Sequence, residues 1–213
     1  MFATVTAGPA QPKGTVLHLV SSLDDTAAEI SDRMAPNVHR ILIIETARLA
    51  EGRSFAPEET LPFEDFGYDT LLCCAEQETS DSLEAKMRSA DACLLLGGNT
   101  FSLMKALEDV EFDELIRRKA LSSDPQPFHI IGESAGAVAM GTTITHVASM
   151  DDPTVPTRRT DRGLSWVDAR VLPHRGCPHW GFGEAVEKVI TSDQHPDSLM
   201  ILDEDQLLTI PAI

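Results

Sequence analysis

Short apolar runs, separated by polar or amphipathic stretches, fill the first two thirds of the chain. The apolar runs predict β-strands at residues 15–21, 38–45, 70–74, 91–96 and 128–131. The stretches between them predict helices at 25–34, 79–89, 101–107 and 111–121, a loop at 46–62 and a short irregular piece at 63–68. Each run is continuously apolar, which is typical of a parallel strand buried on both faces. The alternation of strands and helices therefore predicts an α/β fold with a mainly parallel sheet.

The pattern is less regular after residue 135. It predicts helices at 135–140 and 182–192, strands at 199–202 and 206–210, and a polar stretch at 147–163. Residues 1–13 are mostly small and include two prolines, so we expect a loose N-terminal arm. A chain of 213 residues can form one substantial core, and we expect residues 1–213 to be a single domain.

A serine flanked by glycines follows the strand predicted at 128–131. Gly132 and Gly136 enclose Ser134 in a G-x-S-x-G sequence that leads from a strand into a helix. This context is typical of a nucleophile elbow, in which a sharp turn exposes the serine at the carboxyl end of a strand. Ser134 is therefore the candidate nucleophile, with Ala135 supplying a candidate amide for an oxyanion. A turn that only connects a strand to a helix is the alternative.

A second glycine turn follows the preceding strand. Gly97, Gly98, Asn99 and Thr100 come directly after the run at 91–96. Active sites of open parallel sheets gather at the carboxyl ends of the strands, so the two turns can face each other in the fold. The amides of Gly98 and Ala135 are then the candidate oxyanion donors.

A serine needs a base and an orienting carboxylate to become a nucleophile at neutral pH. His174 is the best candidate base because it follows Pro173 at the end of an apolar stretch, and His179 is the second choice. His18 and His129 lie inside strand patterns, where we expect packed or surface imidazoles. Spacing alone does not choose the acid, for which the candidates include Asp151, Asp152, Asp168 and Glu204.

The charge balance excludes several classes of partner. With 17 basic and 34 acidic residues the net charge is −17, which argues against binding to nucleic acids or to anionic membranes. No apolar run approaches the roughly 18 residues of a membrane span, and residues 1–14 have no signal-peptide pattern. The four cysteines form no C-x-x-C motif, so we expect reduced thiols in the cytoplasm. Cys177 and His179 are too few ligands to predict a metal.

Several stretches resemble one peptidase family. The sequences G-G-N-T-F-S-L at 97–103 and G-E-S-A-G-A at 132–137 resemble motifs of peptidase E, the α-aspartyl dipeptidases, and of their cyanophycinase relatives. The D-D-P at 151–153 and the P-H at 173–174 resemble later elements of that family, and L-D-E-D at 202–205 is loosely similar to another. The resemblance extends over about residues 91–204.

The resemblance implies a flavodoxin-like three-layer α/β fold related to class I glutamine amidotransferases. It also implies a cytoplasmic serine peptidase without cofactor or metal, a monomer or homodimer, acting on short peptides such as dipeptides with N-terminal aspartate. Ser134 would be the nucleophile and His174 the base, with Asp151 or Glu204 as the third member. Asp151 is favoured because its local match is closer. The remaining implied roles are oxyanion binding by Gly98 and Ala135 and substrate binding by Asn99 and Thr100.

An acidic substrate needs a cation, and guanidinium groups bind carboxylates in a bidentate way. The expected cations are Arg158, Arg159, Arg162 and Arg175, with a solvated basic loop as the alternative. Glu133, next to the nucleophile, would repel such a substrate if it pointed inward. Two other functions remain open: an α/β-hydrolase esterase, and a catalytically silent flavodoxin-like binding protein.

Overall fold

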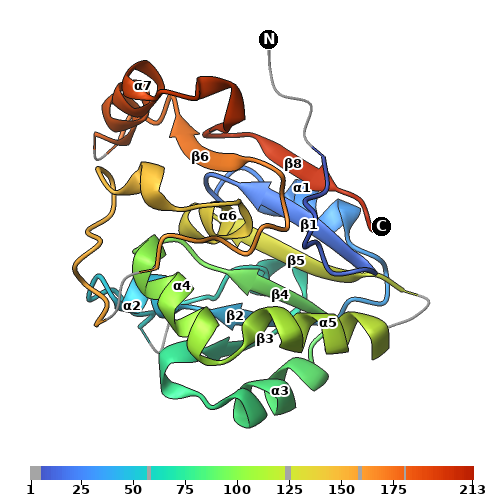
Figure 1. Ribbon diagram of the computed structural model, residues 1–213. Coiled ribbons are helices and arrows are strands. Elements are labelled where there is room, and N and C mark those ends of the chain that lie inside the picture. Colours follow the sequence, from blue (N-terminus) through green and yellow to red (C-terminus); the bar gives the residue numbers. More distant parts are fainter. Residues whose placement is uncertain (1–5, 57–58, 123–125, 158–159, 180) are drawn as a thin grey trace.

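The apolar runs form the strands of one main sheet. The computed structural model describes residues 6–56, 59–122, 126–157, 160–179 and 181–213. In these residues the main sheet has six strands in the order β3-β2-β4-β5-β1-β8, all parallel except β8, which is antiparallel to β1 (Figure 1). The strands are β1 Thr15–Val20, β2 Arg40–Ile44, β3 Asp69–Cys73, β4 Ala92–Leu95, β5 Phe128–Glu133 and β8 Leu207–Ile210.

Helices cover both faces of the sheet, because successive apolar side chains of each strand point to opposite faces. In β2, Leu42 and Ile44 pack into the larger core, whereas Ile41 and Ile43 pack into a second core that contains Ile30 of α1. The helices of the larger core lie together on one side of the sheet (Figure 1). The helices are α1 Ala27–Arg33 on one face, and α3 Ser80–Arg88, α4 Thr100–Asp109, α5 Phe112–Ser122 and α6 Ala135–Met140 on the other. The prediction of a three-layer α/β fold is confirmed.

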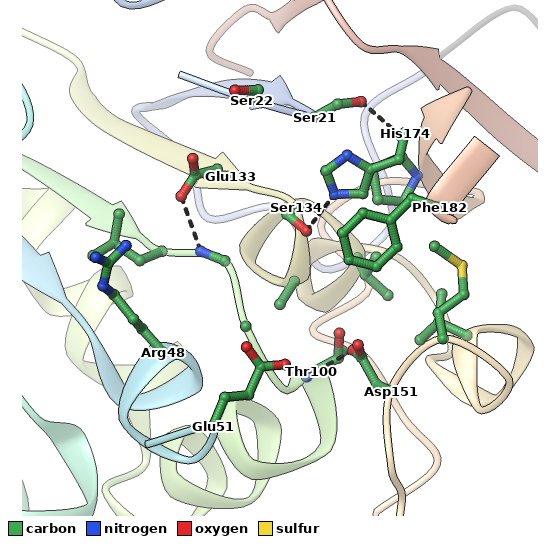
Figure 2. Close-up of a pocket in the computed structure, with 18 of the residues that line it drawn as sticks. Ser21, Ser22, Arg48, Glu51, Thr100, Glu133, Ser134, Asp151, His174 and Phe182 are labelled. Carbon is green, nitrogen blue, oxygen red and sulfur yellow. Dashed lines mark hydrogen bonds between the residues drawn. The ribbon is translucent and has the colours of Figure 1, made fainter. Parts of the chain in front are cut away.

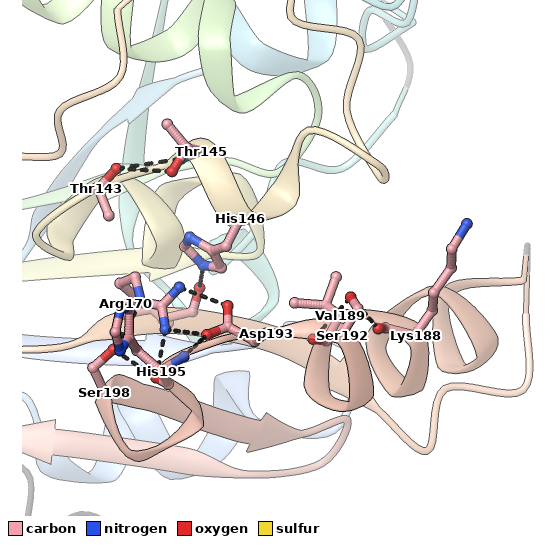
Figure 3. Close-up of polar contacts among 11 residues, drawn as sticks. Thr143, Thr145, His146, Arg170, Lys188, Val189, Ser192, Asp193, His195 and Ser198 are labelled. Carbon is pink, nitrogen blue, oxygen red and sulfur yellow. Dashed lines mark hydrogen bonds and ion pairs between the residues drawn. The ribbon is translucent and has the colours of Figure 1, made fainter.

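A small parallel sheet of β6 (Arg170–Arg175) and β7 (Leu199–Asp203) lies beside the main sheet and carries α7 (Phe182–Ser192). Arg170 anchors this unit (Figure 3). Its guanidinium donates to both carboxylate oxygens of Asp193 at 2.7 Å and to the carbonyl of His195 at 2.6 Å. The ion pair lowers the pKa of Asp193 to about 2. Such a bidentate, poorly exposed pair fixes the end of α7 against β6.

One of the segments predicted as irregular contains a helix. The stretch predicted as a loop at 46–62 begins with a one-turn helix, α2 (Thr46–Leu49). The Thr46 hydroxyl holds it by accepting a hydrogen bond from the amide of Ala75 at 2.8 Å. Four residues give no periodic signal and owe their helix to tertiary contacts. The remaining short helical turns are η1 Glu64–Phe66, η2 Ala75–Gln77, η3 Thr145–Val147 and η4 Pro196–Ser198.

A loose arm is predicted at residues 1–13, of which 1–5 lie outside the described segments; residues 6–13 are instead docked on the rest of the chain. The amide of Gly8 donates to the carbonyl of Trp166 at 2.7 Å. The buried side chain of Gln11 donates to the carbonyls of Thr15 and Pro211, at 3.0 and 3.1 Å. No helix in the described segments is long and apolar enough to cross a membrane.

Two histidines pack together inside the main sheet. The rings of His18 and His129 stack with centroids 5.3 Å apart, and His18 Nε2 lies 2.9 Å from His129 Nδ1. Both residues are buried, which confirms the expectation of packed imidazoles. Burial lowers the pKa of His18 to about 3 and that of His129 to about 4. Both rings are therefore neutral in the folded protein near neutral pH.

We expect the free energy of unfolding to fall as the pH drops from about 6.5 towards 4. The unfolded chain binds two protons in this range that the folded protein excludes, which gives a slope of up to ~2.7 kcal/mol per pH unit. Urea unfolding at a series of pH values measures this slope. The double variant His18→Gln/His129→Gln should have a flatter profile than both the parent and a variant of the exposed His39, His39→Gln. Identical slopes in all three proteins would contradict the assignment.

Candidate active site

A cavity of about 520 Å³ opens at the carboxyl edge of the main sheet, next to the small sheet. Its wall includes Gly97 and Gly98 after β4, and Ser134 and Ala135 after β5. His174 of β6 completes the wall from the other side (Figure 2). The two glycine turns therefore meet at one site, because β4 and β5 are neighbouring parallel strands.

Ser134 lies on a sharp turn between β5 and α6. Its backbone has φ 49° and ψ −109°, and its amide donates to the carbonyl of Val20 at 2.9 Å. The flanking glycines are needed for close packing. A Cβ at Gly132 would lie 2.7 Å from the carbonyl carbon of Gly136, and a Cβ at Gly136 would lie 2.1 Å from the carbonyl oxygen of Leu95. The G-x-S-x-G sequence thus has the local structure of an elbow.

Three side chains form a continuous chain of polar contacts. Ser134 Oγ lies 2.7 Å from Nε2 of His174, and Nδ1 of His174 lies 2.8 Å from Oε2 of Glu204. His174 is buried, with φ 72°, at a bulge in β6. Its ring stacks on Phe182 of α7, with centroids 4.7 Å apart (Figure 2). This arrangement can accept a proton from the serine and hold the resulting imidazolium.

Ser21, at the end of β1, joins the main sheet to the small sheet. Its Oγ accepts a hydrogen bond from the amide of His174 at 2.9 Å (Figure 2). It also donates to the carbonyl of Asp203 at 3.0 Å. One hydroxyl therefore fixes the backbones that carry His174 and Glu204. The sequence pattern shows Ser21 only as the last residue of a strand, so its role could not be read from it.

Asp151 does not make the contact that its local match favours. Its carboxylate accepts a hydrogen bond from the amide of Thr100 at 2.9 Å, and the partner of His174 Nδ1 is Glu204. Burial raises the pKa of Asp151, and the hydrogen bonds from Thr100 counteract this rise. Asn99 caps α4 by accepting from the amide of Ser102, and its side-chain nitrogen donates to the carbonyl of Asp152 at 2.9 Å. Asp151 and Asp152 thus hold the loop at 97–100 in place.

The turn at 97–98 is fixed by packing and by Glu133. Gly98 has φ 131°, and a Cβ there would lie 2.3 Å from the carbonyl oxygen of Ala47. The amide of Gly97 donates to Glu133 Oε2 at 3.1 Å (Figure 2). The amide of Leu23 donates to Oε1 at 3.4 Å. Burial raises the pKa of Glu133, while these two donors lower it. Glu133 is therefore committed to backbone amides, a role that the sequence pattern did not reveal.

The expected substrate cations are not those that line the cavity. Arg175 forms an ion pair with Asp203, with Nε 2.5 Å from Oδ1, and does not line the wall. Arg162 is exposed, and residues 158–159 lie outside the described segments. Arg48 of α2 and Arg53 line the cavity instead. The sequence pattern missed Arg48 because α2 lies inside the stretch predicted as a loop. His179 also lines the wall, but the ring beside Ser134 Oγ is that of His174.

Comparison with known proteins gives the same family that the motifs resemble. The model of Peptidase family S51 matches residues 14–212. The chain belongs to this peptidase family. It is 30% identical over 139 residues to an uncharacterized peptidase of Listeria innocua, covering 60% of this chain and 63% of the relative. It is 31% identical over 115 residues to an uncharacterized peptidase of Listeria monocytogenes, covering 54% and 53%. The matched region is less than two thirds of either relative.

Two solved structures of peptidases share the fold of this S51 protein. A Listeria monocytogenes EGD-e protein described provisionally as peptidase E superposes with a TM-score of 0.72 at 24% identity, covering 93% of this chain and 98% of the other. A peptidase from an acI-B1 Actinobacterium superposes with a TM-score of 0.66 at 18% identity, covering 93% and 84%. At these identities the likeness extends to the fold alone.

The contacts around His174 predict that Ser134 reacts with a fluorophosphonate probe, because an unactivated serine does not. Glu204→Gln should slow labelling by roughly 10²-fold or more, since the ring loses the carboxylate that orients it. Asp151→Asn should slow the labelling of Ser134 much less. Mass spectrometry of the labelled protein measures both rates. Equal slowing by the two variants, each with a parent-like melting temperature, would contradict the geometric choice of Glu204.

Proposed function

We propose that the protein is a serine peptidase that hydrolyses short peptides through an acyl-enzyme. The proposal rests on the chain of contacts from Ser134 through His174 to Glu204. His174 Nε2 takes the proton of Ser134 Oγ as the oxygen attacks the scissile carbonyl carbon. The amides of Gly98 and Ala135, on the cavity wall beside Ser134, hold the oxyanion.

Collapse of the tetrahedral intermediate breaks the carbon–nitrogen bond, and His174 gives its proton to the leaving amine. Water then attacks the ester on Ser134, with His174 as the base, and the second product leaves as a carboxylic acid. Glu204 remains ionised and stabilises the imidazolium in both halves of the reaction. No metal or cofactor takes part in this scheme.

The volume of the cavity favours a small substrate, and Arg48 and Arg53 are the cations on its wall that an acidic substrate could contact. A volume of about 520 Å³ matches a di- or tripeptide rather than a folded chain. Arg48 lies over the ring of Phe55, 4.3 Å from its centroid, and forms an ion pair with Glu59, with 3.6 Å between Nη2 and Oε1. Its buried Nε has no hydrogen-bond partner among the described residues, so the guanidinium can still donate to a carboxylate. We therefore assign the side-chain carboxylate of an N-terminal aspartate to Arg48. The four cysteines are all free, which supports a cytoplasmic site of action.

Ser134→Ala tests the mechanism directly. The variant should lose at least ~10³-fold in kcat for an aspartyl dipeptide or anilide, because it lacks the nucleophilic oxygen. Ser22→Ala removes another hydroxyl from the cavity wall and should retain most of the activity. Turnover is measured by release of the amine product. Unchanged turnover in folded Ser134→Ala would refute the assignment.

Arg48→Gln tests the choice of substrate. Loss of a charge-assisted contact worth about 1.5–3 kcal/mol should reduce kcat/KM for N-terminal aspartate by roughly 10- to 150-fold. The isosteric substrate with N-terminal asparagine carries no side-chain charge, so its kcat/KM should be nearly the same in parent and variant. The ratio of the two kcat/KM values measures the effect. A ratio that is the same in parent and variant would exclude Arg48 as the carboxylate-binding residue.

A further inference from the structure

A tight turn brings a cysteine next to the ring of His174. The amide of Cys177 donates to the carbonyl of His174 at 3.2 Å, and Gly176 takes φ 78° within this turn. The left-handed conformation is the one for which glycine has no steric penalty. The thiol of Cys177 is buried and lies 3.7 Å from the carbonyl of His179, to which it donates.

The turn completes a group of three different metal-ligating side chains. The ligand atoms of His174, Cys177 and Glu204 all lie within 4.8 Å of one another. His174 Nδ1 is the ring nitrogen on this side, since it contacts Glu204 at 2.8 Å while Nε2 faces Ser134. The sequence offered only Cys177 and His179 as candidate ligands. The folded chain adds Glu204 to the candidate ligands, because this residue, 30 positions after His174 in the sequence, contacts the His174 ring in space.

We propose that His174, Cys177 and Glu204 form an inhibitory site for a borderline-soft divalent cation, of which Zn²⁺ is the representative. The site goes beyond the proposed peptidase reaction, in which no metal takes part. Imidazole nitrogen, thiolate sulfur and carboxylate oxygen are the three donor types that Zn²⁺ prefers, whereas Mg²⁺ and Ca²⁺ prefer oxygen alone.

The required movement is small. A tetrahedral zinc has bonds of about 2.0–2.3 Å, so its ligand atoms are ~3.3–3.7 Å apart. His174 and Glu204 would separate slightly from their 2.8 Å contact, and the thiol would move inward from a group that already spans no more than 4.8 Å. Three protein ligands leave a fourth position for water, the coordination that is found in catalytic zinc sites.

Metal at this position stops proton transfer by changing the tautomer of His174. Zn²⁺ takes the lone pair of Nδ1, so the neutral ring carries its proton on Nε2, the nitrogen that faces Ser134 Oγ. That nitrogen then has no lone pair to accept the serine proton. On binding, the Cys177 sulfur–hydrogen bond breaks, its proton leaves to solvent, and a sulfur–zinc bond forms without any change of oxidation state. A chelator reverses every step.

The first test measures binding without any need for peptidase activity. Titration of the purified protein with Co²⁺ should give the near-ultraviolet thiolate-to-cobalt absorption of one ion per chain, and Zn²⁺ should displace it. Cys177→Ala should abolish the absorption and weaken Zn²⁺ binding by at least ~10-fold. Cys73→Ala is the matched control, because Cys73 is also a buried thiol beside a carboxylate, with its Sγ 3.6 Å from Glu78. Cys177→Ser keeps the side-chain size if the alanine variant is unstable.

The second test measures the consequence. Zn²⁺ should block fluorophosphonate labelling of Ser134 in the parent and in Cys73→Ala, with recovery after addition of a chelator. Labelling of Cys177→Ala should continue at the same Zn²⁺ concentration. No thiolate-to-cobalt absorption, or equal Zn²⁺ affinity of parent and Cys177→Ala, would overturn the site. Should Ser134 not label even without metal, the peptidase proposal fails while the binding test still decides the metal site.

Discussion

The site depends on the hydrogen bonds that join the Ser21 hydroxyl to the amide of His174 and to the carbonyl of Asp203. Ser134 belongs to the main sheet, whereas His174 and Glu204 belong to the small sheet and the turn that follows it. Ser21 sits between these parts and binds the backbone of both β6 and β7. Each such bond contributes only about 0.5–1.5 kcal/mol to stability, so its importance is positional. These bonds hold the backbone of His174 at a fixed distance from Ser134.

The small sheet can keep this position because it is itself tied together. Arg170 holds the end of α7 through Asp193, and Arg175 holds β7 through Asp203. Phe182, on the same helix, stacks against His174. A bidentate ion pair and an aromatic contact fix orientation as well as distance. These contacts from α7 and β7 therefore determine where the imidazole of His174 points.

The sequence predicted the sheet and the elbow better than the rest of the site. Continuous apolar runs are typical of strands in a sheet that is covered on both faces. Gly132 and Gly136 are needed at the turn because a Cβ at either position would clash with the neighbouring backbone. The choice between Asp151 and Glu204 depended on distance in space, which local similarity does not encode. In the structure Asp151 instead holds the loop at 97–100 through the amide of Thr100. The contact from Glu204 to His174 needs the whole β6–α7–β7 segment to be folded first.

The positive φ values of Ser134 and His174 have an evolutionary consequence. Ser134 and His174 are among the few described residues other than glycine with positive φ, and their side chains meet at 2.7 Å. Backbones of this kind cost roughly 1–3 kcal/mol each, a cost that glycine would relieve. Drift towards glycine at either position would remove this backbone cost together with the side chain that makes the contact. Persistence of both residues in a lineage would therefore record selection for the side chains themselves, since the backbone conformation alone favours glycine.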